Sequence, residues 1–333
     1  MNLIRVSTGS AAVLGLHRLK MVHPPTTIYL LQHSPDGCKA NCGFCPQARD
    51  SLAADKKQLS RVSWPEFSWP DVRDRIVARY DEGAFTRVCL QTVVYPAFVD
   101  DMLQTVDELL GARKMPMSIA LVPVAIVVME KLKAAGVDRV GIAIDAATPD
   151  LFSRVKGCDA GGPYTWDGHW RAMQDALAVF GKGRVSTHLI AGLGESSKEI
   201  IERMQQVHDA GITIGLFAFT AIPGTRLESR DPPALKQYRQ IQLARYLIVN
   251  GLSCASGFTF DKATGAVTGW GISQDRAISM IEEKGGRMFE TSGCPGCNRP
   301  YYNESTRGPL YNHPAPLTED QVRSAIELLF PGK

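Results

Sequence analysis

Short apolar runs alternate with helical patterns along most of the chain, and this alternation constrains the fold more than any other feature. The runs are apolar nearly throughout, as expected for strands that are covered on both faces. The six clearest are 27–33, 86–92, 117–124, 137–145, 184–190 and 212–219, with weaker candidates at 253–260 and 287–290. Helical patterns follow at 98–112, 124–135, 166–180, 196–210, 234–250 and 273–284.

A strand and helix repeated this often predicts a parallel sheet with right-handed crossovers. We therefore expect an α/β fold, a (β/α)8 TIM-type barrel with a C-terminal extension. No GxGxxG turn follows the first run, which disfavours an open dinucleotide-binding sheet. The predicted divisions are an N-terminal segment (1–24), the barrel (25–290) and an extension (291–333) that ends in a helix from about Glu319.

Composition narrows the function classes. The formal net charge of the 333 residues is +3, which does not predict a nucleic-acid surface but suits an acidic carrier-protein partner. No run of about 18 apolar residues predicts a membrane span, and no secretion signal is recognisable. Eight cysteines in a chain of this size indicate metal ligation or redox chemistry, and we expect a cytoplasmic protein.

The stretch CKANCGFCPQAR places Cys38, Cys42 and Cys45 directly after the first predicted strand, at the barrel edge where active sites are built. Three thiolates this close together can surround one inorganic centre. Structural zinc normally takes four ligands, and no fourth Cys or His lies near in sequence. A 4Fe–4S cluster held by three cysteines leaves one iron open for a substrate or cofactor. A zinc site with a distant fourth ligand is the alternative.

The CxxxCxxC spacing, with Phe44 before the third cysteine, resembles the motif of the radical S-adenosylmethionine (SAM) superfamily. The resemblance implies a radical SAM barrel whose catalytic cluster is held by Cys38, Cys42 and Cys45. In that family SAM chelates the open iron, and one electron cleaves it to methionine and a 5′-deoxyadenosyl radical. That radical abstracts hydrogen from an unactivated carbon.

Further stretches resemble biotin-synthase-like members of the superfamily. They imply that the SAM site includes Phe44, Thr92, Asp145, Arg171, Ile190, Gly192, Glu195 and Pro223. The match is partial, because His188 replaces a glycine and CLQT (89–92) replaces the family's GGE element. Plain structural roles compete: Asp145 as a helix N-cap, Gly192 in a tight turn, and Arg171 as a solvated helix residue.

A second thiol pair, Cys294 and Cys297, forms a CxxC in the Gly- and Pro-rich loop GCPGCNRPYYNE. Such a loop is typical of metal binding. We expect an auxiliary Fe–S cluster, of the 4Fe–4S type, near the barrel mouth with Cys254, Cys294 and Cys297 as ligands. Its fourth ligand would be Cys89, Ser292 or an exogenous group. A structural zinc on the same residues is the alternative, and the isolated Cys158 is interpreted as incidental.

A radical SAM site beside an auxiliary cluster favours sulfur insertion. The resemblance is closest to the two-protein type of lipoyl synthase. It implies an octanoylated lipoyl carrier protein or peptide as substrate, a second radical SAM protein as partner, and ferredoxin or flavodoxin as reductant. Biotin synthase, a methylornithine synthase-like mutase and a hydrogenase maturase are alternatives within the superfamily. A non-catalytic Fe–S or zinc-binding module is the alternative outside it.

Overall fold

The computed structural model describes residues 2–305 and 307–332 and shows an α/β fold around a mostly parallel eight-stranded sheet. Six strands run parallel, each beside the next in chain order: β2 (Thr27–Gln32), β6 (Arg87–Gln91), β7 (Met117–Leu121), β8 (Arg139–Ile142), β9 (Val185–Ala191) and β10 (Thr213–Ala218). Two antiparallel strands extend the β2 edge: β1 (Leu3–Val6) and β5 (Glu66–Ser68). All six residues of β2 are buried, as its apolar sequence predicts.

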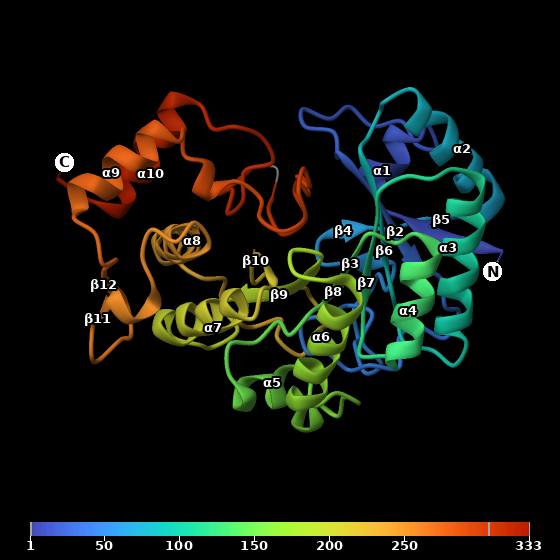
Figure 1. Ribbon diagram of the computed structural model, residues 1–333, viewed down its shortest axis with the longest axis horizontal. Helices are drawn as coiled ribbons and strands as arrows, with labels where there is room; N and C mark the ends of the chain where they lie inside the picture. Colours follow the sequence, from blue (N-terminus) through green and yellow to red (C-terminus); the bar gives the residue numbers. More distant parts are fainter. Residues whose placement is uncertain (1, 306, 333) are drawn as a thin grey trace.

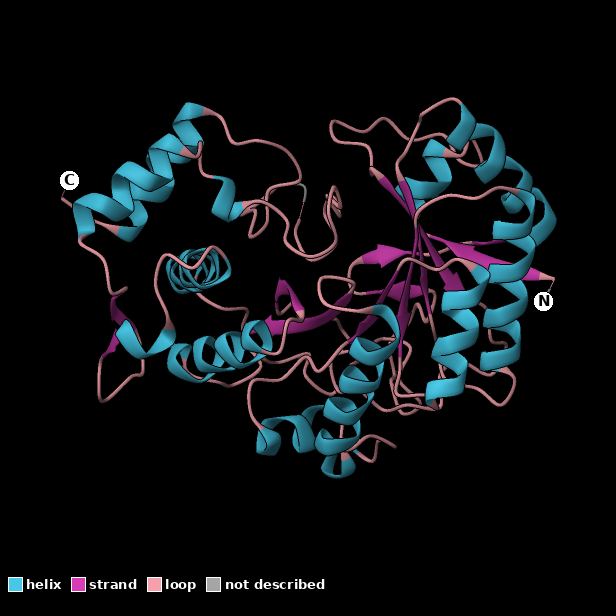
Figure 2. Ribbon diagram, in the orientation of Figure 1, coloured by secondary structure: helices cyan, strands magenta, loops and turns pink. Residues whose placement is uncertain are grey.

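Helices cover the outer side of the sheet (Figures 1 and 2). They are α1 (Thr8–Val13), α2 (Trp69–Asp81), α3 (Phe98–Ala112), α4 (Ile126–Ala135), α5 (Pro149–Val155), α6 (Trp166–Phe180) and α7 (Ser197–Asp209). Side-chain caps fix several helix starts. Ser196, for example, forms a capping box with Glu199 at the start of α7.

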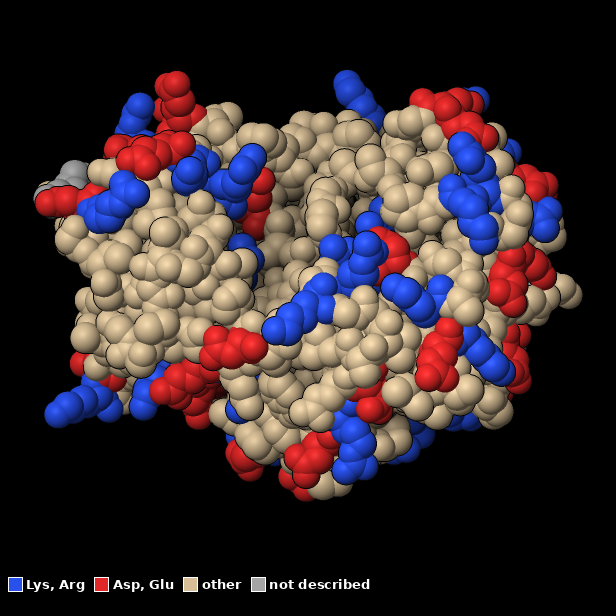
Figure 3. All heavy atoms as spheres, viewed as in Figure 1, with Lys and Arg blue, Asp and Glu red and all other residues tan. Residues whose placement is uncertain are grey.

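The C-terminal third adds α8 (Leu235–Val249), α9 (Gln274–Glu283) and α10 (Glu319–Leu329) beyond β10 (Figure 1). The surface is hollowed between this part and the part that carries the sheet, and Lys and Arg side chains gather beside the hollow (Figure 3). Of the helices in the described residues, none combines the length and apolar composition needed to cross a bilayer.

Two predicted strands are wrong, so the sheet has six parallel strands instead of eight. Residues 255–257 form a 3-10 turn (η2), and β11 (Thr259–Phe260) pairs only with β12 (Val267–Gly269). Residues 287–289 form another 3-10 turn (η3). The small polar residues at 253–257 cannot fill a buried strand position. A third 3-10 turn, η1, spans Cys158–Ala160.

The N-terminal segment contributes to the sheet, which the sequence did not predict. Three of the four residues of β1 are buried, but a strand this short carries little periodic signal. The small hairpin of β3 (Gln58–Leu59) and β4 (Val62–Ser63) was also not predicted. The proposed domain divisions at residues 24 and 290 stay a prediction.

The segment 291–303 spans the space between the two ends of the parallel sheet, which we call the seam. In residues 2–305 and 307–332, no ladder joins β10 to the β2 side. Ser292 Oγ accepts a hydrogen bond from Leu216 N on β10 at 2.8 Å. On the other side, Asn298 Oδ1 accepts one from Thr26 N, next to β2, at 3.0 Å. Backbone from the C-terminal extension therefore fills the place of further strands.

Candidate active site

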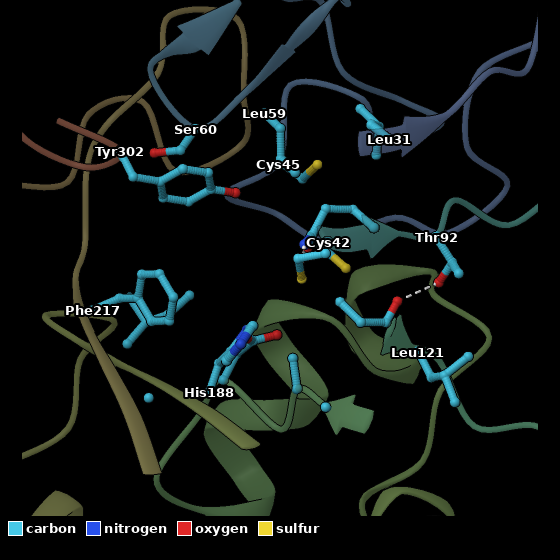
Figure 4. A pocket seen from close by; sticks show the side chains of 18 of the residues that line it. Leu31, Cys42, Cys45, Leu59, Ser60, Thr92, Leu121, His188, Phe217 and Tyr302 are labelled. Carbon is cyan, nitrogen blue, oxygen red and sulfur yellow. Dashed lines mark hydrogen bonds between the residues drawn. The ribbon is translucent and has the colours of Figure 1, made fainter. Parts of the chain in front are cut away.

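The first thiol loop lies over the carboxyl ends of the parallel strands. Cys45 N donates to Cys42 O at 3.0 Å, which closes a turn, and Gly43 N donates to Val155 O at 2.7 Å. A Cβ on Gly43 would lie 2.9 Å from the guanidinium of Arg226, so a larger residue here would have to displace that side chain. Cys38, Cys42 and Cys45 all line one cavity of about 280 Å³. Figure 4 shows Cys42 and Cys45 in its wall.

The Cys42 and Cys45 thiols of this loop are uncharged unless a metal centre binds them. Burial raises the pKa of the Cys42 thiol to about 11, although nearby Lys156 opposes the shift. Burial, followed by the other two thiols of the loop, also raises the pKa of Cys45. Because metal ligation requires thiolates, binding of a cluster here releases protons.

A buried ion pair lies beside Cys42. Lys156 Nζ donates to Asp145 Oδ2 and to Ala143 O, both at 2.7 Å, and both charged side chains are under 9% exposed. Burial alone would lower the pKa of Lys156, but Asp145 and Cys42 outweigh it and raise this pKa. Lys156 is therefore a fixed positive charge at the first thiol loop.

Asp145 has a strained backbone and is not a helix cap. Its φ is +61°, in the left-handed region that non-glycine residues rarely adopt. Its N–H donates to His188 O and its carbonyl accepts from Ile190 N, both at 2.8 Å, which holds this conformation. Thr148 supplies the N-cap of α5, so the alternative role of Asp145 as that cap is excluded.

The structure divides the other residues predicted for the SAM site into two groups. Phe44, Thr92, Asp145 and Ile190 line the cavity. Gly192, Glu195, Pro223 and Arg171 do not. Glu195 accepts a hydrogen bond from Gly192 N at 2.6 Å, so this pair stabilises the turn before α7.

The structure corrects the assignment of Arg171 to the SAM site, because this residue lies exposed on α6 and does not line the cavity. Arg299 and Lys156 both line the cavity, and Lys156, which lies beside Cys42, is the one that the sequence analysis missed. The available signal was a lysine within the glycine-rich loop KGCDAGG. His188, noted only as a departure from the family pattern, also lines the cavity and stacks on Phe217 with ring centroids 4.8 Å apart. Burial lowers the pKa of His188 to about 4.

The second thiol set lines the same cavity from the opposite end of the strands. Thr26 and Thr86, which precede β2 and β6, lie against the CxxC loop, and Thr26 Oγ1 donates to Gly296 O at 2.5 Å. Cys294 and Cys297 face the cavity together with Cys89 of β6. The loop thus lies at the amino ends of the strands and not near the mouth that holds the first loop.

Neighbouring polar groups fix the second thiol set. Tyr29 Oη lies 3.0 Å from Cys297 Sγ, and Gln91 Nε2 donates to Cys89 Sγ at 3.0 Å. Burial raises the pKa of Cys89, and Cys294 and Cys297 raise it further. The three sulfurs are therefore electrostatic neighbours.

Cys254 does not belong to this set, which corrects the predicted ligand group. It lies exposed in the turn before β11, and its Sγ is 3.2 Å from Ser256 Oγ. It was assigned here because 253–260 was interpreted as a barrel strand. Ser292 does line the cavity, but its hydroxyl is hydrogen-bonded to β10.

Neither thiol set is preformed around a single ion. In the described part of the chain, no three His, Cys, Asp or Glu side chains converge closely enough to hold one metal ion. A cubane is larger than one ion and holds its thiolates farther apart. Three cysteines facing one cavity are the donor set that fits a 4Fe–4S cluster with an open iron.

Comparison with known proteins identifies the class. The radical SAM superfamily model matches residues 34–207, and the chain belongs to this superfamily. Membership implies a radical SAM enzyme with a 4Fe–4S cluster and SAM. No curated protein matches the sequence.

Solved structures agree on the fold. Methylornithine synthase (PylB) is similar with a TM-score of 0.52 and 14% identity, over 67% of this chain and 62% of that one. The FeFe-hydrogenase maturase HydG from Carboxydothermus hydrogenoformans is similar with a TM-score of 0.50 and 17% identity, over 65% of this chain and 50% of that one. The alignments thus span about half to three-fifths of those proteins.

Proposed function

We propose that this enzyme inserts sulfur into an unactivated C–H bond, using a second Fe–S cluster held by Cys89, Cys294 and Cys297. The observation that carries the proposal is that both thiol sets line one cavity, from opposite ends of the strands. A substrate carbon between them would meet a radical source on one side and a sulfide source on the other.

At the first end, Cys38, Cys42 and Cys45 would hold the 4Fe–4S cluster and Lys156 would bind the carboxylate of SAM. When bound, these groups supply the reductive cleavage of SAM that starts hydrogen abstraction. The chain's own work is to position and to exclude water. Lys156 suits its role because it keeps its charge while buried, and Asp145 holds it in place.

At the second end, positive charge favours an anionic cluster. Arg87 and Arg139 both act electrostatically on Cys294 and lower its pKa against the larger effect of burial. Arg87 is anchored by Asp138 at 2.6 Å and by Ser118 at 2.9 Å, so this charge is fixed. The fourth ligand position would be taken by Ser292 or by an exogenous group.

The middle of the cavity suits an alkyl chain. Its wall is largely apolar and includes Leu31, Val93, Ile119, Leu121, Ile190 and Phe217. We therefore propose an octanoyl chain on a carrier-protein lysine as the substrate, as in the two-protein lipoyl synthases. A second radical SAM protein would install the other sulfur, and ferredoxin or flavodoxin would deliver the electron. All eight cysteines are free, which is in keeping with a cytoplasmic site of action.

Anaerobic reconstitution followed by iron, sulfide and zinc analysis tests the proposal. We expect about eight irons per chain, for two cubanes, SAM cleavage on reduction, and sulfur in an octanoyl-lysine peptide. About four irons with SAM cleavage but no sulfur transfer would favour a mutase or maturase. Zinc without SAM cleavage would indicate a binding module.

A further inference from the structure

A second cavity, of about 370 Å³, adjoins the first at the seam. Four segments line it: the start of α1, the loop 19–25, the β3–β4 turn and residues 299–305. The side chains that line both cavities are Tyr29, Trp64, Arg299 and Tyr302, and we call them the partition. One layer of side chains therefore separates the second cavity from the space between the two thiol sets.

The backbone of the partition is strained. Arg299 has φ +35° and Tyr301 has φ +56°, on either side of Pro300. Left-handed conformations at non-glycine residues are strained and are concentrated at ligand clamps and switch regions. Arg299 is held by its N–H, which donates to Tyr29 Oη at 3.2 Å, and by a cation–π contact with Phe217 at 3.9 Å.

The partition also contains a buried donor without an acceptor. Trp64 is 1% exposed, and its indole N–H has no hydrogen-bond partner in the described residues. Leaving such a donor unpaired is unfavourable, because the loss of its hydrogen bond to water is not compensated. An amide carbonyl carried by a chain that threads the partition would provide the acceptor.

Loop 16–23, which contributes Leu19 and Met21 to the lining of the second cavity, is basic and partly apolar. The first acidic residue of the sequence is Asp36, whereas the preceding loop carries His17, Arg18 and Lys20. Leu19 and Val22 in that loop are 47% and 80% exposed. Within residues 2–305 and 307–332, neither Arg18 nor Lys20 forms an ion pair.

Glu304 also lines the second cavity, but it does not offset the positive charge of loop 16–23. Glu304 is 5% exposed and points away from solvent, where it accepts hydrogen bonds from Asn312 N and Nδ2, both at 3.0 Å. Burial raises the pKa of Glu304, against hydrogen bonds from Asn312 that lower it. Arg61 adds another exposed cation on the opposite side.

We propose that the second cavity is the docking and entry site for an acyl-lysine presented by an acidic carrier protein. The acidic surface would lie against loop 16–23, and the acyl chain would pass between Trp64 and Tyr302 into the first cavity. The amide carbonyl would then accept the Trp64 indole N–H. This inference rests on the proposed function, because it takes the acyl chain from it.

Binding of labelled peptides to the anaerobic, cluster-loaded enzyme tests the docking site without turnover. The probes are two fluorescein-labelled octanoyl-lysine peptides, one flanked by Asp and Glu and the other by Asn and Gln. We expect the acidic peptide to bind more tightly, with an affinity that falls as salt rises. The variant Arg18→Glu/Lys20→Glu should weaken its binding about tenfold. Lys262→Glu, an exposed cation in the β11–β12 hairpin, is the matched control and should have no effect.

Two further variants probe the path. Met21→Trp fills the second cavity without changing charge and should block binding of both peptides. Trp64→Phe keeps a ring but removes the donor, and should weaken both peptides about 3- to 10-fold. SAM cleavage should persist in Arg18→Glu/Lys20→Glu and Met21→Trp, which shows that these variants fold.

Wild-type affinity in both Arg18→Glu/Lys20→Glu and Met21→Trp would overturn the docking site. The proposed function fails separately. If peptide binding depends on salt and on the variants as expected but the peptide gains no sulfur, the docking site is supported and sulfur insertion is contradicted. If Arg18→Glu/Lys20→Glu and Met21→Trp both insert sulfur with an unchanged KM, sulfur insertion is supported and the docking site is contradicted.

Discussion

The two thiol sets sit at opposite ends of the same strands but are encoded in different ways. Cys38, Cys42 and Cys45 lie within eight residues, in one loop after β2. The second set joins Cys89 of β6 to a CxxC some 200 residues later, across the seam. A local motif positions its own ligands, whereas the second set exists only when the C-terminal extension packs against the sheet. The first should therefore tolerate changes in the extension, and the second should not.

The electrostatic settings differ as well. The first set has one buried cation, Lys156, whose charge is shared with Asp145. The second set has Arg87 and Arg139, anchored around Asp138 at the amino ends of the strands. Under the proposed function, the charge at the first end would orient SAM, and the charges at the second end would neutralise an anionic cluster.

The largest effect is expected from cysteine substitution at the two ends. Cys38→Ala should abolish SAM cleavage, because the cluster that binds SAM loses one of its three ligands. Cys294→Ala/Cys297→Ala should leave SAM cleavage near wild type while removing sulfur transfer and about half of the iron. Measurement of 5′-deoxyadenosine and product by mass spectrometry separates the two outcomes. Loss of SAM cleavage in the double variant would mean that the ends are not independent.

Cys89 and Cys254 form a matched pair that tests the membership of the second set. Cys89→Ala should lower the iron content as Cys294→Ala does, because its thiol faces the cavity. Cys254→Ala should change neither iron nor activity, because its thiol is exposed beside Ser256. Iron and sulfide content per chain is the measurement. The reverse result would restore the ligand set expected from sequence and reject the proposed set of Cys89, Cys294 and Cys297.

The incorrect assignment of Cys254 as a cluster ligand shows which features of the molecule could be predicted from the sequence. The six parallel strands and the first thiol loop were predictable, because each is encoded by a continuous apolar run or by spacing within one loop. The second set was not, because its assignment depended on whether 253–260 is a barrel strand. Those residues carry β-compatible side chains at one end only, and tertiary packing decides their place.

Lys156 was missed for a related reason. Its sequence neighbours are a helix end and a glycine-rich loop, and nothing local indicates a buried charge. Only the fold brings it to Asp145, eleven positions earlier in the chain, and to Cys42. Arg171, chosen instead by its distance from a strand, lies on the outer side of α6. Spacing along the chain predicted a cation for the SAM site but did not identify the lysine that lines the cavity beside Cys42.

Lys156→Met should weaken SAM binding and also destabilise the fold. It leaves the Asp145 carboxylate buried without a partner, which costs about 3–5 kcal/mol. Asp145→Asn/Lys156→Met should recover part of this loss, since no unpaired charge remains. Urea unfolding and SAM titration are the measurements, with exposed Lys131→Met on α4 as the control. Unchanged SAM affinity in Lys156→Met would remove it from the cofactor site.

The smallest predicted effect is on the pH dependence of the free energy of unfolding, and it comes from His313, which lies behind the second thiol loop. His313 is buried, and its carbonyl accepts a hydrogen bond from Thr291 N at 3.0 Å, just before that loop. Arg239 Nη2 lies 3.2 Å from His313 Nε2, and since arginine only donates, this nitrogen is an acceptor and the ring is neutral. Burial, and then Arg239, lower the pKa of His313 to about 4.

Between pH 4 and about 6.5, the unfolded chain therefore binds a proton at His313 that the folded chain does not. The free energy of unfolding should be highest above pH 6.5 and should fall as the pH drops, by about 1–2 kcal/mol from this residue at pH 5. His313→Gln should reduce that slope, as measured by urea unfolding at pH 7 and pH 5. At the first end, burial lowers the pKa of His169, which lies beside Lys156, to about 3. His169→Gln is therefore the matched variant. Equal reductions of the pH slope in the two variants would mean that His313 and His169 are equally protected from protonation in the folded chain. An unchanged slope in His313→Gln would mean that water reaches His313 behind the second thiol loop.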